Sequence, residues 1–281
     1  MNDDPHFSMS QINMLLRCGM QYYYRYACGL RRPPGVAMLI GSGTHTSVET
    51  NLRNVISTGE PIPQEAAEEV ARDAVNNSWE AQGVVLDEDE AAEGEKKVKG
   101  KAVASAVRMS VLHHGEVAPQ IKPIAVEKPF RLHLPDGVRD LIGFVDIEEP
   151  DGLIDTKTKR GKAPQKGTAE TSLQLTAYSM ASWVESGKQK NPDYVAVDFL
   201  VDKPNGAEHL RQSTQFDQED YGRLLRRIAI AEKQVEAGLF MPCDPGNWCC
   251  SAKFCGYWDE CPFGRKQSVT VNIGECEWKQ E

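Results

Sequence analysis

The chain has 281 residues, of which 40% are hydrophobic and 26% charged, a composition that is typical of a globular protein and excludes a largely disordered one. No apolar run approaches the roughly 18 residues that cross a bilayer, and the start shows neither the basic residues nor the apolar core of a signal peptide, so we expect a cytoplasmic protein. The net charge of -9 argues at first against a nucleic-acid partner, because phosphate attracts Lys and Arg.

The negative charge is concentrated in one part of the chain. Residues 60–95 hold 12 acidic residues and one basic residue, which leaves 29 acidic and 31 basic residues, a net charge of +2, for the rest. We interpret the acidic stretch as a solvated helix face and loop, the alternative being an acidic tail that binds a partner. The balanced remainder permits a basic groove.

The first 115 residues are expected to be helical. Ser8 or Ser10 can cap the first helix, and a Pro-Gly break at residues 31–35 precedes the second. Apolar residues at helical spacing and Ala- and Glu-rich stretches then predict four helices, over residues 8–27, 38–57, 64–82 and 97–114.

From residue 124 the pattern becomes strand-like. Turn signals at residues 135–137 and 151–152 separate three strands that should form a meander, at residues 124–134, 138–149 and 153–158. A helix at 170–186, strands at 193–202 and 208–216 and a final helix at 217–238 follow. We expect an α/β fold with a mixed sheet flanked by helices.

No long or flexible linker divides the chain, so we expect one domain over residues 1–281. Its parts would be a helical N-terminal part (1–120), an α/β core (121–240) and a cysteine-bearing C-terminal clasp (241–281).

Two acidic residues are predicted to meet at the ends of neighbouring antiparallel strands. Asp146 ends the run GFVD, and Asp155 stands in the next strand with Lys157 on the same face, since side chains alternate along a strand. Converging carboxylates suit Mg²⁺ or Mn²⁺, and a nearby lysine can orient an attacking water or stabilise charge at phosphorus. An exposed ion pair of Asp155 and Lys157 is the alternative.

Further polar residues have a place in this pattern. Gln174 and Tyr178 lie one helical turn apart on the following helix, although they could equally form a helix-surface pair. Taken alone, His45 reads as a capping or packed histidine, and Glu127 reads as an outward strand residue, with a further metal-site carboxylate as the alternative.

In spacing and order these residues resemble the RecB-like branch of the PD-(D/E)XK nuclease superfamily, over roughly residues 8–262. That family carries a helix histidine, a G-x-x-D strand end, a D/E-x-K strand and a Q-x-x-x-Y helix. The matching residues here are His45, Gly143 to Asp146, Asp155 with Lys157, and Gln174 with Tyr178.

The resemblance implies a restriction-endonuclease-like fold and a role for each residue. Asp146, Asp155 and the Thr156 carbonyl would bind Mg²⁺ or Mn²⁺, and Lys157 would serve the nucleophile. His45 would add a ligand or shape the site. Gln174 and Tyr178 would orient the lysine loop or touch DNA.

The most basic stretch of the chain, TKTKRGKAPQK, begins in the same strand. Such a run is usually a solvated loop, but beside a phosphate-cleaving site it also offers cations to a DNA backbone. We expect Lys159, Arg160 and Lys162 to contact phosphate.

Six of the eight cysteines lie near the C-terminal end. Because the sequence shows no export signal and the cytosol keeps thiols reduced, we do not expect these cysteines to form a disulfide framework. Cys250, Cys255 and Cys261 stand among aromatic residues, so three thiolates could converge there. Cys249 and Cys243 are alternatives to Cys250 as ligands, and a set of merely buried thiols is the alternative to a metal site. Cys28 and Cys276 have no evident partner and are expected to be ordinary thiols.

In RecB-like nucleases with an iron-sulfur cluster, one N-terminal cysteine joins three C-terminal ones, a position that Cys18 would take here. The resemblance therefore implies a [4Fe-4S] cluster, while tetrahedral Zn²⁺ uses the same ligands. The metal would act as a structural staple between the chain ends.

These expectations define a metal-dependent DNA nuclease, an exonuclease by resemblance, acting in recombination, repair or phage replication. The chain has no G-x-x-x-x-G-K-[ST] phosphate loop, so unwinding would need a helicase in trans, and a recombinase is a further candidate partner. The alternatives are a CRISPR-adaptation nuclease, a non-catalytic DNA-binding assembly subunit, and a zinc protein in which only the cysteines act.

Overall fold

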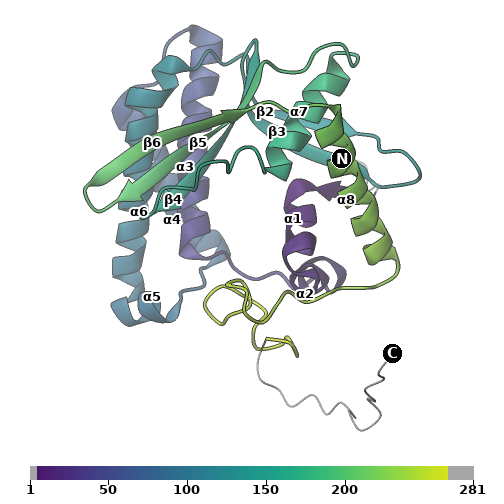
Figure 1. Ribbon diagram of the computed structural model, residues 1–281. Helices are drawn as coiled ribbons and strands as arrows, with labels where there is room; N and C mark the ends of the chain where they lie inside the picture. The colour runs from purple at the N-terminus through teal and green to yellow at the C-terminus, as the bar shows by residue number, and fades with distance from the viewer. Residues whose placement is uncertain (1–4, 265–281) are drawn as a thin grey trace, which may run out of the picture.

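The computed structural model describes residues 5–264, which form a six-stranded mixed sheet with helices on both faces (Figure 1). The strand order is β1-β3-β4-β5-β6, and β2 also pairs with β3. The strands are β1 (His6–Ser8), β2 (Ala125–Leu132), β3 (Asp140–Glu148), β4 (Gly152–Arg160), β5 (Tyr194–Lys203) and β6 (Gly206–Thr214). The predicted fold class and the β2-β3-β4 meander are confirmed.

The helical elements follow one another along the chain as follows. They are α1 (Met9–Arg17), α2 (Gly19–Tyr22), the π-helix η1 (Tyr23–Ala27), α3 (Val36–Thr58), α4 (Gln64–Gln82), α5 (Glu88–Glu93), α6 (Glu95–Leu112), the π-helix η2 (His113–Val117), the 3₁₀ turn η3 (Ala118–Gln120), α7 (Leu173–Glu185) and α8 (Gln218–Glu236). Among the described residues, no helix is long and apolar enough to cross a membrane.

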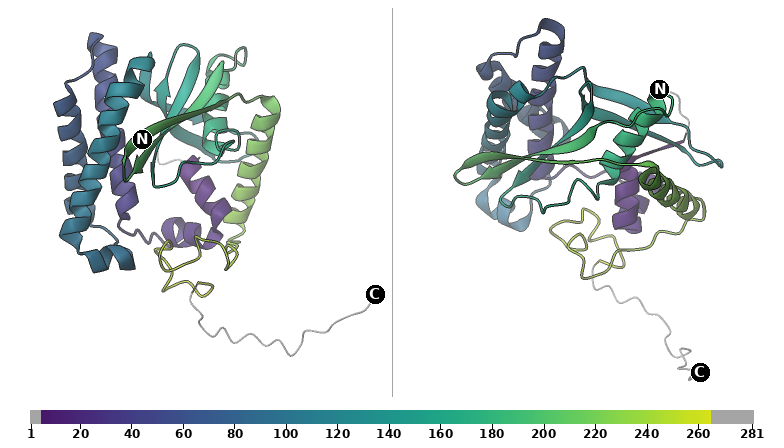
Figure 2. Two further views of the ribbon diagram at one scale, coloured as in Figure 1. Left: turned by 60° about the vertical axis from the view of Figure 1, so that its left-hand side comes forward. Right: turned by 45° about the horizontal axis from the view of Figure 1, so that its top comes forward.

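Each face of the sheet has its own apolar core. On β5, Val195, Val197 and Phe199 pack with α1, α7 and α8, whereas Ala196 and Leu200 pack with α3, α4 and α6. Figure 2 shows α3, α4 and α6 as a layer of long helices beside the sheet. The alternation of side chains along a strand therefore supplies both layers from one continuous apolar run.

The first helix differs from the prediction at Cys18. Ser8 caps α1 with a capping box to Gln11, as the sequence indicates. At Cys18, however, the backbone is extended (φ −161°, ψ 107°), and the N–H of Gly19 donates to the carbonyl oxygen of Met241 at 2.7 Å. The uninterrupted helix over 8–27 is thus wrong, because the helix breaks where the end of the chain docks against it.

Other differences concern short elements. The strand β1 comes directly before α1, in a part of the chain that was expected to be all-helical. With three residues it is too short to give a sequence pattern of its own. The helix α5 forms within the acidic stretch, where Asp87 makes a capping box with Glu90. Acidic residues near a helix N-terminus are favourable, because the helix dipole is positive there.

The C-terminal clasp, whose described part is residues 241–264, joins regions that are far apart in the sequence. The hydroxyl of Tyr257 donates to the carbonyl oxygen of Leu30 at 2.8 Å, and Lys253 forms an ion pair with Asp87 at 3.1 Å. Figure 1 shows the clasp, in yellow, against α2. It therefore links the start of the chain to the layer of long helices.

The close approach of α3 and α4 can be tested at Gly43. A Cβ atom there would stand 2.5 Å from the buried Val75 side chain, whereas a Cβ atom at Gly100 in α6 would meet open space. We expect Gly43→Ala to lower the free energy of unfolding by about 1–3 kcal/mol. Gly100→Ala should raise it by about 0.5–1 kcal/mol, because alanine favours the helix. Urea unfolding measures both, and an unchanged or higher stability of Gly43→Ala contradicts this packing.

Candidate active site

The sheet opens at the residues singled out by the sequence. The recorded pairs of β3 with β4 are Ile147 with Ile154 and Glu148 with Leu153, and the pairs of β3 with β1 end at Ile142. Beyond Ile154, β4 continues in parallel with β5 to Arg160. The stretch Gly143–Asp146 therefore lies on an open edge, where β3 and β4 part.

Asp146 spans this opening. Its Oδ2 accepts a hydrogen bond from the backbone N–H of Thr156 at 3.0 Å, so a side chain replaces the missing main-chain pair. Asp155 is the residue before Thr156, and its side chain is 2% exposed. The two predicted acids are thus brought together inside β3 and β4, at the point where the two strands part.

Tyr178 of α7 contacts both acids. Its hydroxyl lies 3.0 Å from Asp146 Oδ1 and 3.5 Å from Asp155 Oδ1. Gln174 donates its side-chain amide to the same hydroxyl at 2.7 Å, which leaves the hydroxyl hydrogen for a carboxylate. Ser172 caps α7 and fixes where the helix begins. The pair is therefore part of the site and not a helix-surface pair.

Lys157 stands on the same face of β4 as Asp155, as predicted. Its Nζ lies 2.9 Å from Asp155 Oδ1, and the lysine side chain is 44% exposed while the aspartate is buried. The ammonium group therefore neutralises Asp155 on one side and faces solvent on the other.

The electrostatics of the site favour a bound cation. Burial, followed by the charge of Asp146, raises the pKa of Asp155 to about 7, although Lys157 and Tyr178 oppose the rise. Burial lowers the pKa of Lys157, but Asp155 and Asp146 outweigh it, so the net direction is upward. Burial also raises the pKa of Tyr178, and both acids add to this effect. Two crowded carboxylates are thus compensated by one ammonium group.

The donors present fit a hard divalent cation. Mg²⁺ is usually held by one or two carboxylates, with water and substrate phosphate completing its shell. Asp146, Asp155 and the Thr156 carbonyl supply such a partial set. Within residues 5–264, no group of three or more His, Cys, Asp and Glu side chains is arranged to hold a metal ion.

His45 reaches the site from the opposite helical layer. Its Nδ1 lies 3.7 Å from Asp146 Oδ2, and about a third of its side chain is exposed. The helix α3 carries it, and α3 approaches β4 closely at Gly41, where a Cβ atom would stand 3.2 Å from Thr158 Oγ1. His45 is thus near Asp146, which the residue alone did not indicate.

Glu127 is the acidic residue that the sequence interpretation placed wrongly. It lies opposite Asp146, between the recorded pairs of Val126 with Ile147 and Lys128 with Val145. Its φ of 50° puts the backbone in the left-handed region, so strand alternation does not give its direction. Burial raises the pKa of Glu127, and the charge of Asp146 adds to the rise. It is half-buried beside the acid pair, not an outward residue.

The basic stretch leads away from the acids along β4. Lys159, Arg160 and Lys162 are exposed, and the ion pairs recorded within residues 5–264 include none of the three. Gly161 has a φ of 79°, a turn conformation that glycine adopts without strain. The stretch therefore presents exposed cations to solvent, although Arg160 also contributes to lowering the pKa of Asp202.

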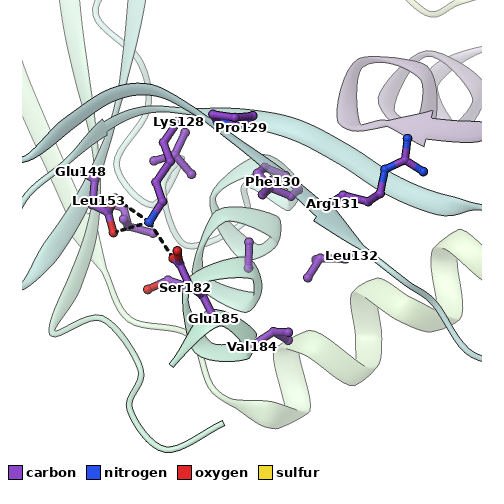
Figure 3. Close-up of a pocket in the computed structure, with 12 residues that line it drawn as sticks. Lys128, Pro129, Phe130, Arg131, Leu132, Glu148, Leu153, Ser182, Val184 and Glu185 are labelled. Carbon is purple, nitrogen blue, oxygen red and sulfur yellow. Dashed lines mark hydrogen bonds and ion pairs between the residues drawn. The ribbon is translucent and has the colours of Figure 1, made fainter. Parts of the chain in front are cut away.

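A cavity of about 240 Å³ lies next to the site, between β2, β3 and the C-terminal half of α7. Figure 3 shows Lys128 pointing toward Glu148 and Glu185, with which it forms ion pairs at 2.9 and 2.7 Å. Phe130 also lines the cavity, and its ring packs edge-on against Tyr178 at 6.2 Å. The acid pair does not line this cavity, so the candidate active site is the separate opening between β3 and β4.

The cysteines gather in the clasp. Cys18 and five C-terminal cysteines line one small apolar pocket with Tyr24, Tyr257 and Trp258. The pocket cysteines are Cys18, Cys243, Cys249, Cys250, Cys255 and Cys261. Cys28 is exposed, and Cys276 lies outside the described residues.

The thiols crowd one another. Cys243 Sγ lies 3.4 Å from Cys249 Sγ, and burial followed by contacts with Cys249 and Cys18 raises the pKa of Cys243. Burial raises the pKa of Cys250 and Cys255 as well. Burial therefore favours the protonated thiols, and within residues 5–264 the cysteines, like the acids, form no group of three or more side chains arranged to hold a metal ion.

Two acids and a lysine at the parting of two strands, backed by a helix tyrosine, are a set of groups suited to metal-assisted phosphodiester hydrolysis. The family model described as "PD-(D/E)XK nuclease superfamily" matches residues 6–262, and the chain therefore belongs to this superfamily. No sequence among the curated proteins matches it.

Two solved structures resemble the chain at low sequence identity. One is a Eubacterium rectale protein described as "Putative exonuclease", with 10% identity and a TM-score of 0.48, covering 87% of this chain and 86% of that one. The other is SSO0001, with 13% identity and a TM-score of 0.33, covering 90% of this chain and 95% of that one.

The buried charge of Asp155 should make stability depend on pH. A carboxyl group with a raised pKa binds more protons in the folded protein, so the free energy of unfolding falls as pH rises from about 4 to about 7. In EDTA at pH 8, Asp155→Asn should raise the free energy of unfolding by about 1–3 kcal/mol. The gain is smaller than the full free-energy equivalent of the Asp155 pKa shift, because the substitution also removes the ion pair with Lys157. The gain should shrink at pH 5.

Asp151→Asn is the matched control for this measurement, since Asp151 lies in the turn before β4 with a 66% exposed side chain. It should show no comparable dependence on pH. A loss of stability in Asp155→Asn at pH 8 contradicts the electrostatic account.

Proposed function

We propose that this protein is a Mg²⁺- or Mn²⁺-dependent deoxyribonuclease that hydrolyses phosphodiester bonds. The observation that carries the proposal is the meeting of Asp146, Asp155 and Lys157 at the parting of β3 and β4, with Tyr178 bonded to the acids. This arrangement speaks against a non-catalytic DNA-binding subunit, which would not need it.

The residues divide the work. Asp146, Asp155 and the Thr156 carbonyl would hold the cation, and His45 would add a ligand or shape the site. When bound, a divalent cation supplies Lewis acidity and neutralises charge at the phosphate. The half-exposed ammonium of Lys157 donates hydrogen bonds to the attacking water or to a phosphate oxygen.

Other side chains hold these groups in place. Tyr178 fixes the carboxylate of Asp146, and Gln174 fixes the direction of the Tyr178 hydroxyl. Lys159, Arg160 and Lys162 bind the DNA backbone beside the catalytic strand, which positions the substrate without reading its sequence.

We further propose exonuclease action, because the RecB-like branch associates a helix histidine with it and His45 lies beside Asp146. The chain has no phosphate loop for nucleotide-driven unwinding, so a helicase or recombinase would act in trans on duplex DNA. Recombination, repair or phage replication are the processes that need such an activity.

We propose that the clasp holds a [4Fe-4S] cluster through Cys18, Cys250, Cys255 and Cys261, with Zn²⁺ as the alternative ion. The support is the convergence of these thiols on one apolar pocket. Cys243 and Cys249 line the same pocket and are alternative ligands to Cys250. The metal would tie α2 to the clasp and act as a structural staple.

The catalytic proposal predicts that Asp155→Ala and Lys157→Ala abolish cleavage, with a loss of at least about 10³-fold, while DNA affinity in Ca²⁺ changes little. End-labelled DNA with Mg²⁺, Mn²⁺ or EDTA provides the assay. Asp151→Ala should keep wild-type cleavage. Full activity of Asp155→Ala would remove the mechanism.

Closed circular single strands separate the two modes of action. An exonuclease degrades linear DNA and leaves circles intact. Cutting of circles at a comparable rate would show endonuclease action and overturn the exonuclease assignment alone.

The staple predicts a metal-dependent stability. Anaerobically purified wild type should contain about four iron atoms per chain and a visible absorption band, and Cys255→Ser should be pale and aggregation-prone. Cys28→Ser, at an exposed cysteine outside the pocket, should match the wild type. A colourless wild type with one zinc ion per chain would exclude the iron-sulfur cluster, while the proposal of a structural metal in the clasp would stand.

A further inference from the structure

The glycine of the G-x-x-D strand end lies against an aromatic ring. Gly143 of β3 is the cross-strand partner of Phe130 of β2. A Cβ atom at Gly143 would stand 2.7 Å from Cζ and 2.8 Å from Cε1 of the Phe130 ring. Both distances are well inside the roughly 3.5 Å at which carbon atoms pack. The Phe130 ring can therefore occupy this place only because residue 143 has no side chain.

The same ring contacts the tyrosine of the candidate active site. The rings of Phe130 and Tyr178 meet edge to face, with 6.2 Å between their centroids and 79° between their planes. This arrangement is favourable, because the positive edge of one ring meets the negative face of the other. Phe130 thus contacts Gly143 on the neighbouring strand and Tyr178 on α7.

Tyr178 has its polar partners at one end of the side chain. Its hydroxyl donates to Asp146 Oδ1 at 3.0 Å and accepts from the Gln174 amide at 2.7 Å. The rest of the side chain is a buried ring, and the residue is 3% exposed. Within the described part of the chain, Phe130 is the one aromatic ring recorded against it. The hydroxyl keeps its place beside Asp146 only while this ring does not tilt.

A cavity of about 240 Å³ leaves space on another side of the Phe130 ring (Figure 3). Phe130 is only partly buried, and Val145 and Ala181 line the cavity with it. A ring beside open space stays in one position only if its other contacts hold it there. The contacts with Gly143 and Tyr178 are therefore the ones that fix the ring.

We propose that Phe130 is a positioning residue of the nuclease, which holds the Tyr178 ring so that its hydroxyl reaches Asp146, and that Gly143 is needed to admit the Phe130 ring. The positioning role rests on the proposed function, whereas the packing of the three residues does not.

Phe130 acts through Tyr178 and does not touch the substrate. The Tyr178 hydroxyl bonds to Asp146, whose other carboxylate oxygen accepts the N–H of Thr156. A displaced Tyr178 therefore loosens the carboxylate that joins β3 to β4. Because small displacements of catalytic groups cause large losses of rate, the effect should appear in kcat and not in KM.

A double-mutant cycle of Gly143→Ala and Phe130→Leu tests the packing, by urea unfolding of the full chain in EDTA. Leucine lacks the Cζ and Cε1 atoms that a Cβ atom at residue 143 would meet. We expect Gly143→Ala to lower the folding equilibrium constant at least about fivefold in the wild-type background and to leave it unchanged or raised in the Phe130→Leu background. Equal effects in both backgrounds overturn the packing.

The cycle also decides if Gly143→Ala alone does not fold. Folding of the double variant then supports the packing, because removal of the ring atoms has made room for the added methyl group. A double variant that does not fold either overturns it.

Steady-state cleavage tests the positioning role, at a temperature where each variant is fully folded. Phe130→Leu should lower kcat about tenfold with KM within about twofold. Val184→Ala is the matched control, because Val184 lines the same cavity from α7 and is 39% exposed. It should keep the wild-type kcat. Wild-type kcat in Phe130→Leu, or an equal loss in Val184→Ala, refutes the role.

The route through the hydroxyl is tested in Tyr178→Phe, which keeps the ring but has no hydroxyl to direct. Adding Phe130→Leu to it should change kcat less than about twofold. A further tenfold loss in the double variant, or wild-type kcat in Tyr178→Phe alone, refutes the positioning role. Where Tyr178→Phe cleaves too slowly to measure, the comparison of Phe130→Leu with Val184→Ala decides.

Failure of the positioning role is distinguishable from failure of the proposed function. A wild type that does not cleave DNA at all refutes the nuclease and the positioning role together, while the unfolding cycle still decides the packing. Cleavage by the wild type with an unchanged kcat in Phe130→Leu refutes the positioning role alone.

Discussion

The hydrogen bond from the Thr156 amide to Asp146 is the interaction on which the site depends. It joins β3 to β4 at the point where their main-chain pairing has stopped, so one acid holds the strand that carries the other. Continued pairing would satisfy the backbone but close the space for a cation and a phosphate. Ending the pairing leaves backbone N–H and C=O groups without a main-chain partner, and Asp146 satisfies one of them, the N–H of Thr156. The opening is therefore both the weak point of the sheet and the place of the proposed active site.

Each side of the opening is supported by a different helical layer. Tyr178 approaches from α7, which packs with α1 and α8, and His45 approaches from α3, which packs with α4 and α6. The acids thus lie between two apolar cores that are separated by the sheet. Relative movement of the layers would change the distances to Asp146. Under the proposed function, the packing of both cores against the sheet is consequently a condition of the chemistry.

Patterns that repeat along the chain were predictable, and interactions between distant segments were not. The meander and the shared face of Asp155 and Lys157 follow from strand alternation, which is a local property. The break at Cys18 depends on Met241, more than two hundred residues away, and the direction of Glu127 depends on a left-handed backbone that alternation does not describe. The approach of His45 to Asp146 likewise depends on how α3 packs, so its place in the family pattern was the only signal available.

The clasp has a further consequence for how the molecule is made. Its contacts reach back to Leu30 and to the N-terminus of α5, so they span most of the chain's length. During synthesis the sheet and both helical layers emerge first, and their apolar surfaces can bury one another before the last cysteines leave the ribosome. Docking of the clasp is then a late step that requires an already formed α2. Until the clasp docks, the nearly complete molecule has an unsealed end, a natural target for proteolysis.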